Sequence, residues 1–207
     1  MHLADRCRTV LASAATAVAA TALFAAPASA LTEVSPAGCP AVPMVQPFTP
    51  WQDAADYMLA PDGDVEAGAT SWLLQGGARA VEGNEPFKVG RAADHTSLQL
   101  PAGSSATTAP MCIGVEHRTM RFFASAAKSG ALVVTATYTK RNGTVKSVRL
   151  GAARGTSTWA PSDVLPMRVN EKAENFDNAL WVTLTFAPRG ADAWLVDDVY
   201  IDPFRFK

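Results

Sequence analysis

The chain has 207 residues, of which 48% are hydrophobic and 18% are charged, and its formal net charge is −1. This near-neutral balance argues against nucleic acid and against an anionic membrane as partner. The length suits one domain with a full hydrophobic core. Beyond the first thirty residues, no apolar run reaches the roughly 18 residues of a membrane span.

The first thirty residues have the pattern of an export signal. Arg6 and Arg8 form a short basic start, and residues 10–26 form an apolar run rich in alanine. The Ala-Ser-Ala sequence at 28–30 has the small-x-small form of a signal-peptidase site. We therefore expect residues 1–30 to be a signal peptide cleaved near Ala30, and the mature chain to be secreted.

Residues 31–60 are predicted to form a proline-rich N-terminal arm rather than a regular element, because five prolines oppose helix and interior strand. Within it, residues 51–59 favour a short helical turn or an edge strand on the domain surface. Cys39 and Cys112 are the cysteines that remain after cleavage. In an exported protein such a pair favours one disulfide, which would join the arm to the body. The alternative is two separate buried thiols.

Residues 61–207 are predicted to form a single all-β domain. Strand-like runs recur every ~8–15 residues with turn residues between them, which is typical of a sandwich or barrel. Asn142 and Gly143 lie between two alternating runs and predict a hairpin. The strand at 178–187 has one clean apolar face. The other predicted strands cover 72–74, 78–81, 97–100, 111–115, 119–124, 131–139, 144–150, 165–169 and 194–202.

Two adjacent carboxylates, Asp197 and Asp198, lie in the middle of the last predicted strand. Strand side chains alternate between faces, so whichever face is buried takes one carboxylate with it. A buried carboxylate needs a cation, a set of donors or a proton. The candidates are a bound cation or an arginine such as Arg118 or Arg121.

Two separated segments resemble a known family. The sequence Asp-Val-Glu-Ala-Gly at 64–68, followed by Trp72, resembles the opening of secreted jelly-roll carbohydrate-binding modules of the xylan- and glucan-binding type. The sequence Trp-Leu-Val-Asp-Asp-Val at 194–199 resembles their closing strand. The whole chain also resembles a group of exported actinobacterial proteins through its Gly-Gly-Ala, Arg-Phe-Phe and Asp-Asp-Val-Tyr-x-Asp-Pro segments.

The resemblance implies a galactose-binding-like, jelly-roll β-sandwich of two antiparallel sheets whose first and last strands lie side by side. It also implies a structural calcium ion held by Glu66 and Asp198, and the carboxylates of Asp64 and Asp197 are further candidates. Calcium prefers six to eight oxygen ligands, which suits such a set. The alternative is that the acidic residues near position 64 only shape a turn.

Three aromatic residues are candidates for binding sugar, because pyranose rings stack on exposed aromatic faces. Trp181 lies opposite the apolar face of its strand, Trp159 lies in a loop, and Tyr138 lies near the end of a hairpin strand. The alternative for all three is that they pack beneath loops.

No catalytic residue is predicted, since the chain has no Gly-x-Ser-x-Gly nucleophile motif and residues as close in sequence as Asp94, His95 and Ser97 cannot form a triad among themselves. A glycosidase could use paired carboxylates from Glu82, Glu85 and Glu116, but nothing distinguishes these from surface residues. The expected function is a secreted, non-catalytic domain that binds carbohydrate of the cell wall or environment. One alternative is a structural or protein-interaction domain of the cell envelope. A weaker alternative is a small secreted hydrolase.

Overall fold

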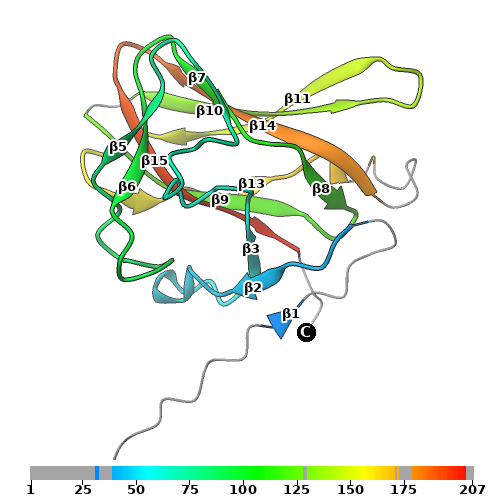
Figure 1. Ribbon diagram of the computed structural model, residues 1–207, viewed down its shortest axis with the longest axis horizontal. Coiled ribbons are helices and arrows are strands. Elements are labelled where there is room, and N and C mark those ends of the chain that lie inside the picture. The colour runs from blue at the N-terminus through cyan, green and yellow to red at the C-terminus, as the bar shows by residue number, and fades with distance from the viewer. Residues whose placement is uncertain (1–30, 33–38, 128–129, 171, 173–178, 204–207) are drawn as a thin grey trace, which may run out of the picture.

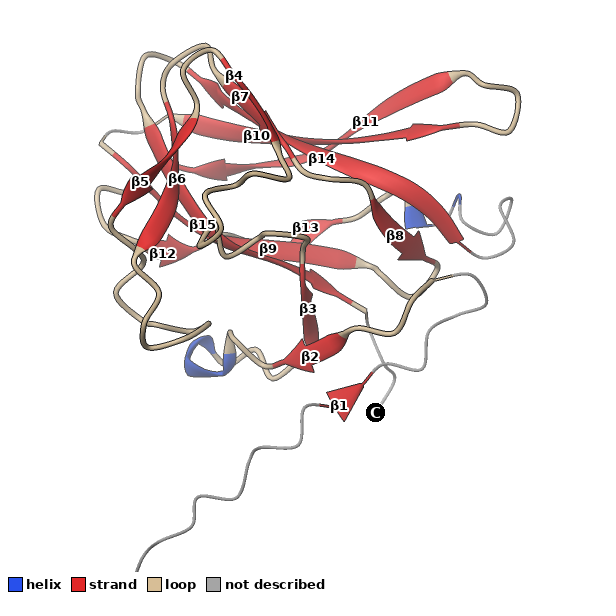
Figure 2. Ribbon diagram, in the orientation of Figure 1, coloured by secondary structure: helices blue, strands red, loops and turns tan. Residues whose placement is uncertain are grey.

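The computed structural model describes residues 31–32, 39–127, 130–170, 172 and 179–203, so the predicted signal peptide lies outside the described residues. Two antiparallel sheets pack face to face, and the predicted all-β sandwich is confirmed (Figure 1). A short 3-10 helix, η1 (Thr49–Trp51), lies beside the first sheet (Figure 2). Within the described ranges, no helix is long and apolar enough to cross a membrane.

The first sheet, called sheet A, has the central order β1-β2-β3-β15-β6-β5, and β9 pairs with the other edge of β15. The short strands β12 and β13 pair in turn with β9. Its strands are β1 (Leu31–Thr32), β2 (Pro43–Val45), β3 (Tyr57–Leu59), β5 (Arg79–Glu82), β6 (Thr96–Leu100), β9 (Thr119–Ala126), β12 (Ala160–Pro161), β13 (Leu165–Pro166) and β15 (Trp194–Asp202).

The second sheet, called sheet B, has the order β11-β10-β14-β7-β4, and β8 pairs with the far end of β14. Its strands are β4 (Leu73–Gln75), β7 (Ser105–Thr107), β8 (Met111–Gly114), β10 (Ala131–Thr139), β11 (Val145–Arg154) and β14 (Ala179–Arg189). The predicted hairpin is confirmed, because β10 and β11 are joined by a turn in which Gly143 has a φ of 80°.

The core lies between the two sheets and follows the alternation of side chains. The predicted apolar face of β14 is confirmed, since its four large residues are at most 4% exposed: Leu180, Val182, Leu184 and Phe186. The rings of Trp72 and Phe186 stack with their centroids 5.8 Å apart. Burial of such apolar area contributes roughly 25 cal/mol per Å2.

The N-terminal arm differs in part from its prediction, because residues 31–32 and 43–45 add short strands to sheet A. Residues 57–59 form a strand, which was one of the two alternatives expected for residues 51–59. Strand β2 pairs with β3, and β3 pairs with the last residues of β15. The prolines do not prevent this, since Pro43 stands at the first position of a three-residue strand, where proline is tolerated.

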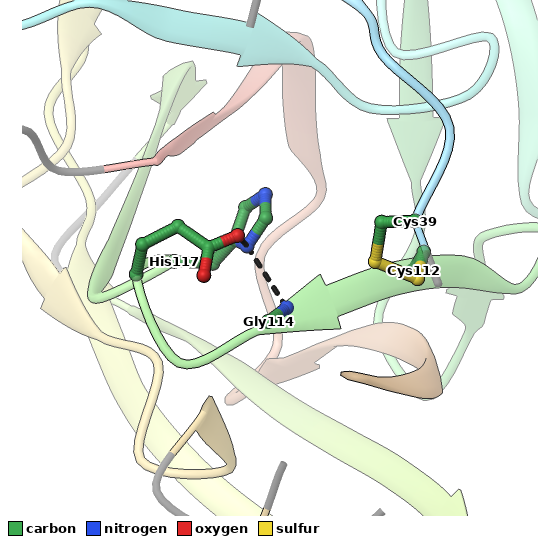
Figure 3. Close-up of a disulfide and its surroundings, with 5 residues drawn as sticks. Cys39, Cys112, Gly114 and His117 are labelled. Atoms are coloured by element: carbon green, nitrogen blue, oxygen red, sulfur yellow. Dashed lines mark hydrogen bonds and ion pairs between the residues drawn. A yellow bond between two sulfur atoms is a disulfide. The ribbon is translucent and has the colours of Figure 1, made fainter. Parts of the chain in front are cut away.

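The predicted disulfide between Cys39 and Cys112 is confirmed, with the two Cα atoms 5.5 Å apart (Figure 3). It joins the arm to β8 of sheet B and so connects the two sheets at one end. A bond that closes 73 residues of chain restricts the unfolded state considerably.

We expect the Cys39→Ser, Cys112→Ser double variant to lose about 4 kcal/mol of unfolding free energy, the chain-entropy estimate for a loop of this length. Denaturant unfolding of oxidised wild type and variant measures the loss. Added reductant should bring the wild type down to the level of the variant and should not affect the variant. Equal midpoints for the oxidised wild type and the variant would contradict the connecting role of this bond.

Candidate functional site

The middle of β15 has no continuous strand partner on one edge. Its first residues, Trp194 to Val196, pair with β6, and its later residues Tyr200 and Ile201 pair with β3. On the other edge the register against β9 shifts between Asp197 and Tyr200, which is a β-bulge. Asp198 takes a φ of 50° there, a left-handed conformation that non-glycine residues adopt rarely.

The bulge overturns the predicted alternation of this strand. Asp197 and Asp198 are both 1% exposed, so both carboxylates are buried rather than one. Val196, Val199 and Ile201 all belong to the main core, although strict alternation would separate the first from the other two. The extra residue of the bulge resets the faces, which sequence periodicity cannot detect.

Two chain segments surround these carboxylates. Residues 60–66 lie along the bulge, where the Ala60 amide donates to the Val199 carbonyl at 2.8 Å and the Val199 amide donates to the Gly63 carbonyl at 3.0 Å. Main-chain hydrogen bonds therefore bring the acidic opening segment beside the closing strand, as expected. The loop 83–95, between β5 and β6, supplies two more buried acids, Glu85 and Asp94.

The carboxylates predicted to hold a metal have different partners. Glu66 accepts hydrogen bonds from the main-chain amides of His95 at 2.8 Å and Thr96 at 2.7 Å. Asp64 forms an ion pair with Arg91 at 2.8 Å. Asp197 accepts a hydrogen bond from the amide of its neighbour Asp198 at 2.9 Å. It accepts a longer one from the Glu85 amide at 3.4 Å.

The carboxylate of Asp198 is buried, and neither of its oxygens has a hydrogen-bond partner among the described residues. Burial raises the pKa of Asp198 to about 7, and the nearby charges of Glu85, Asp94, Asp64 and Glu66 raise it as well. Burial also raises the pKa of Asp197 to about 9, with the charge of Asp198 as the next cause. Burial and the neighbouring carboxylates therefore favour the protonated form of Asp197 and Asp198, and no side chain among the described residues pairs with the oxygens of Asp198.

Arg121, one of the two arginines expected as a partner of the buried aspartates, does not pair with Asp198. The Arg121 guanidinium donates to the Asp53 carboxylate at 2.7 Å and to the Ser162 carbonyl at 3.0 and 3.1 Å instead. The oxygens of Asp94 and Asp198 approach Gly90, where an added Cβ would lie 2.6 Å from Asp94 Oδ2 and 3.3 Å from Asp198 Oδ1. Across the described ranges, no group of three or more histidine, cysteine or acidic side chains is already arranged to hold a metal ion.

A second candidate site is the outer face of sheet B, on the side away from the core. Trp181 lies there and is 60% exposed, because it alternates with the buried residues of β14. Two rows of hydroxyl residues cross the neighbouring strands. One row joins Thr135, Thr185 and Thr107, and the other joins Thr183, Thr137 and Ser147.

The hydroxyls in these rows are partly paired with each other. Thr107 and Thr185 share a hydrogen bond of 2.9 Å, and so do Thr137 and Ser147. A hydroxyl can donate once and accept twice, so each pair keeps capacity for a ligand. Near Trp181, at the end of the sandwich that carries the disulfide, there is a hollow of about 120 Å3 that is also lined by Val42, by Met111 and by Met58 of sheet A.

The other two aromatic candidates have different environments. Tyr138 is 8% exposed and packs in the main core, because its position on β10 faces inward. The structure thus removes Tyr138 as a stacking residue. Trp159 is partly buried and packs against an aromatic cluster on the outer side of sheet A, formed by Phe48, Tyr57, Phe123 and Tyr200. Trp181 alone among the three presents a largely open ring.

The position of Glu85 and Asp94 beside Asp198 was not predicted from the sequence, and neither were the hydroxyl rows. Glu85 precedes Pro86 in what reads as an ordinary turn, and its burial depends on the path of the whole loop 83–95. The alternation of Thr183 and Thr185 on β14 was visible. Their alignment with Thr135 and Thr107 depends on strand order, which local sequence does not encode.

A search with the sequence matches no protein-family model, and it matches no curated protein sequence. Several solved structures have a similar fold at low identity. The xylan-binding family 22 module of a Paenibacillus barcinonensis protein is 16% identical, with a TM-score of 0.47 over 72% of this chain and 94% of that one. A family 61 module solved with β-1,4-galactotriose is 15% identical, with a TM-score of 0.41 over 72% and 98%.

A Clostridium thermocellum xylanase fragment with a family 22 module, solved with xylohexaose, is 12% identical, with a TM-score of 0.46. That match covers 68% of this chain but only 27% of the larger protein. These likenesses are too distant to assign a ligand or a role to any residue of this chain.

The Arg121–Asp53 pair beside the aromatic cluster gives a pH-dependent prediction. Burial works to raise the pKa of Asp53, but hydrogen bonds from Tyr57 and Arg121 outweigh it and hold that pKa below its usual value. A carboxylate with a lowered pKa stabilises the fold above about pH 4, and this contribution is lost as the pH falls further. Asp53→Asn should therefore be about 1–3 kcal/mol less stable than wild type at pH 7.

The difference in unfolding free energy should shrink as the pH falls from 5 to 2, because acid protonates Asp53 in the wild type. Urea unfolding across this range measures it. The matched control is Asp56→Asn, which removes a nearby carboxylate that accepts a hydrogen bond from Gln46. A pH-independent difference would contradict the proposed ionic role of Asp53.

Proposed function

We propose that the protein is an exported, non-catalytic domain that binds a carbohydrate polymer on the outer face of sheet B. The observation that carries the proposal is the open indole of Trp181, 60% exposed on a sheet face whose neighbouring strands present rows of hydroxyls. An aromatic face stacks on the apolar side of a sugar ring, and the hydroxyls exchange hydrogen bonds with sugar hydroxyls.

The shape of this surface favours a polymer over an enclosed small molecule. Pockets that bury small ligands usually have volumes of about 300–1,000 Å3. The hollow beside Trp181 has about 120 Å3, which is too small to enclose a sugar chain. A ligand on this face would therefore lie on the open surface of the sheet rather than inside the hollow.

The envelope-protein alternative has weaker support from this face. Its two exposed aliphatic residues are Leu73 and Val145, which are 60% and 62% exposed. They lie on β4 and β11, the two edge strands of the sheet order, with three strands between them. Two separated side chains do not make the contiguous apolar patch that marks a protein interface.

In a protein of residues 31–207, Trp181→Ala should lower the affinity for any polysaccharide that the wild type binds by at least tenfold. Affinity electrophoresis through gels containing a panel of soluble polysaccharides measures this. Because the indole is exposed, the variant should keep the wild-type melting temperature. Leu73→Ala is the matched control and should leave binding within twofold. Failure of the wild type to bind any polysaccharide would contradict the proposal.

We also propose that a structural calcium ion binds at the bulge of β15, held by Asp198 and Asp94, with Glu85 and Asp197 adding negative charge. The support is the buried Asp198 carboxylate with two unpartnered oxygens and its approach to Asp94 at Gly90. A buried charge without a partner is costly, and calcium suits carboxylate oxygens. Glu66 and Asp64, which the sequence also suggested, would act indirectly, since amides and Arg91 already occupy them. Asp94 also accepts the Arg91 amide at 2.6 Å, and it is placed in the ligand set because its Oδ2 lies with Asp198 Oδ1 around Gly90.

Removal of divalent cations with a chelator should lower the melting temperature of the wild type by several degrees, and added calcium should restore it. Asp198→Asn should lose this response, because its amide cannot supply the charge. Asp163→Asn, on an exposed carboxylate, should keep the full response. Identical melting curves for the wild type with and without the chelator would exclude a structural cation here.

A further inference from the structure

The acidic residues of this protein are divided unevenly between its two sheets. The strands of sheet B contain no aspartate or glutamate, although they contain Lys146, Arg149, Arg154 and Arg189. The acidic groups gather instead around sheet A and its loops, including the six carboxylates near the bulge of β15. The net charge of −1 conceals this separation.

Strand register places three of these arginines on the same outer face as Trp181. Arg154 and Arg189 lie on either side of Ala131, in one row across β11, β10 and β14. Arg149 stands at the end of the row that continues through Thr135 and Thr185. All three arginines are exposed, and none forms an ion pair with another described residue.

The distances between these rows suit an extended chain. Residues on a strand are about 3.3 Å apart, so Trp181 lies roughly 13 Å from Thr185 along β14 and Arg189 lies roughly 13 Å beyond it. Strands are about 4.8 Å apart, so Arg149 lies roughly 10 Å to the side of Thr185. A polymer along β14 would meet the indole first, then the hydroxyls and Arg149, and finally the Arg154 and Arg189 row.

A neutral polymer would give these three arginines no partner of opposite charge. A ligand that covers exposed guanidinium groups displaces their water, and this costs free energy unless the ligand supplies acceptors of opposite charge. A planar guanidinium matches carboxylate and phosphate oxygens with two parallel hydrogen bonds. Nucleic acid fits less well, because the protein as a whole is slightly acidic, with a sequence pI near 6.3.

We propose that the outer face of sheet B selects an acidic polysaccharide, one that carries carboxylate or phosphate groups along its length. This inference rests on the proposed sugar-binding role of Trp181 and adds the charge of the ligand. Trp181 and the hydroxyl rows contact the sugar rings, while Arg149, Arg154 and Arg189 pair with the anionic groups.

The test compares one sugar backbone with and without its charge. Affinity electrophoresis is run with polygalacturonate and with its fully methyl-esterified form, at equal calcium and at low and high salt. We expect at least tenfold tighter binding to the charged form, with most of that preference lost in 0.5 M NaCl because salt screens the pairing. Poly(glycerol phosphate) in a third arm distinguishes phosphate from carboxylate as the preferred group.

The variant Arg149→Gln, Arg189→Gln should lose the preference for the charged form while keeping its binding to the esterified form. The matched control is Arg79→Gln, which removes an exposed arginine from β5 of sheet A and should change neither affinity. Melting curves for all variants should agree with wild type, since these side chains are exposed.

Equal affinity for both forms, lost in Trp181→Ala, would overturn the charge selectivity and leave the proposed sugar binding intact. Binding of poly(glycerol phosphate) or DNA that is unchanged in Trp181→Ala would show a general cation surface and overturn both proposals. Binding of no polymer in any arm would also overturn both.

Discussion

The burial of two adjacent carboxylates in β15 is the constraint on which the rest of the structure depends. Asp197 and Asp198 lie between the part of β15 that pairs with β6 and the part that pairs with β3. The bulge that carries them also lets Val196 and Val199 both enter the core. The same residues therefore influence the packing of the sandwich and belong to a group of carboxyl side chains on one side of it.

The two sheets of the molecule differ in the residues that they carry. The side of sheet A carries the acidic group, the N-terminal arm and the aromatic cluster, all of which hold chain segments together. Sheet B is free of acids on its strands and presents its indole, hydroxyls and arginines to solvent. Sheet A and its loops thus stabilise the fold, while the outer face of sheet B remains available for a ligand.

Much of this architecture could be predicted from local pattern, and the exceptions have physical causes. The Asn142-Gly143 hairpin and the apolar face of β14 follow from turn chemistry and alternation, and the structure confirms both. The disulfide was predicted from the expected export and from the two cysteines that would remain, and the structure confirms it. The face of Asp198 could not be predicted, because a bulge breaks alternation without a sequence signal. Tyr138 was misjudged, since its face depends on which side of β10 meets sheet A.

On the proposed function, ligand contacts fall on sheet B and spare the acidic side. Amide chemical-shift mapping in buffer that contains calcium, with titration of an acidic oligosaccharide, measures where the ligand binds. We expect perturbations confined to β10, β11 and β14, together with the indole N–H of Trp181. Perturbations centred on the loop 83–95 or on the aromatic cluster around Phe123 would contradict it and move the binding site to sheet A.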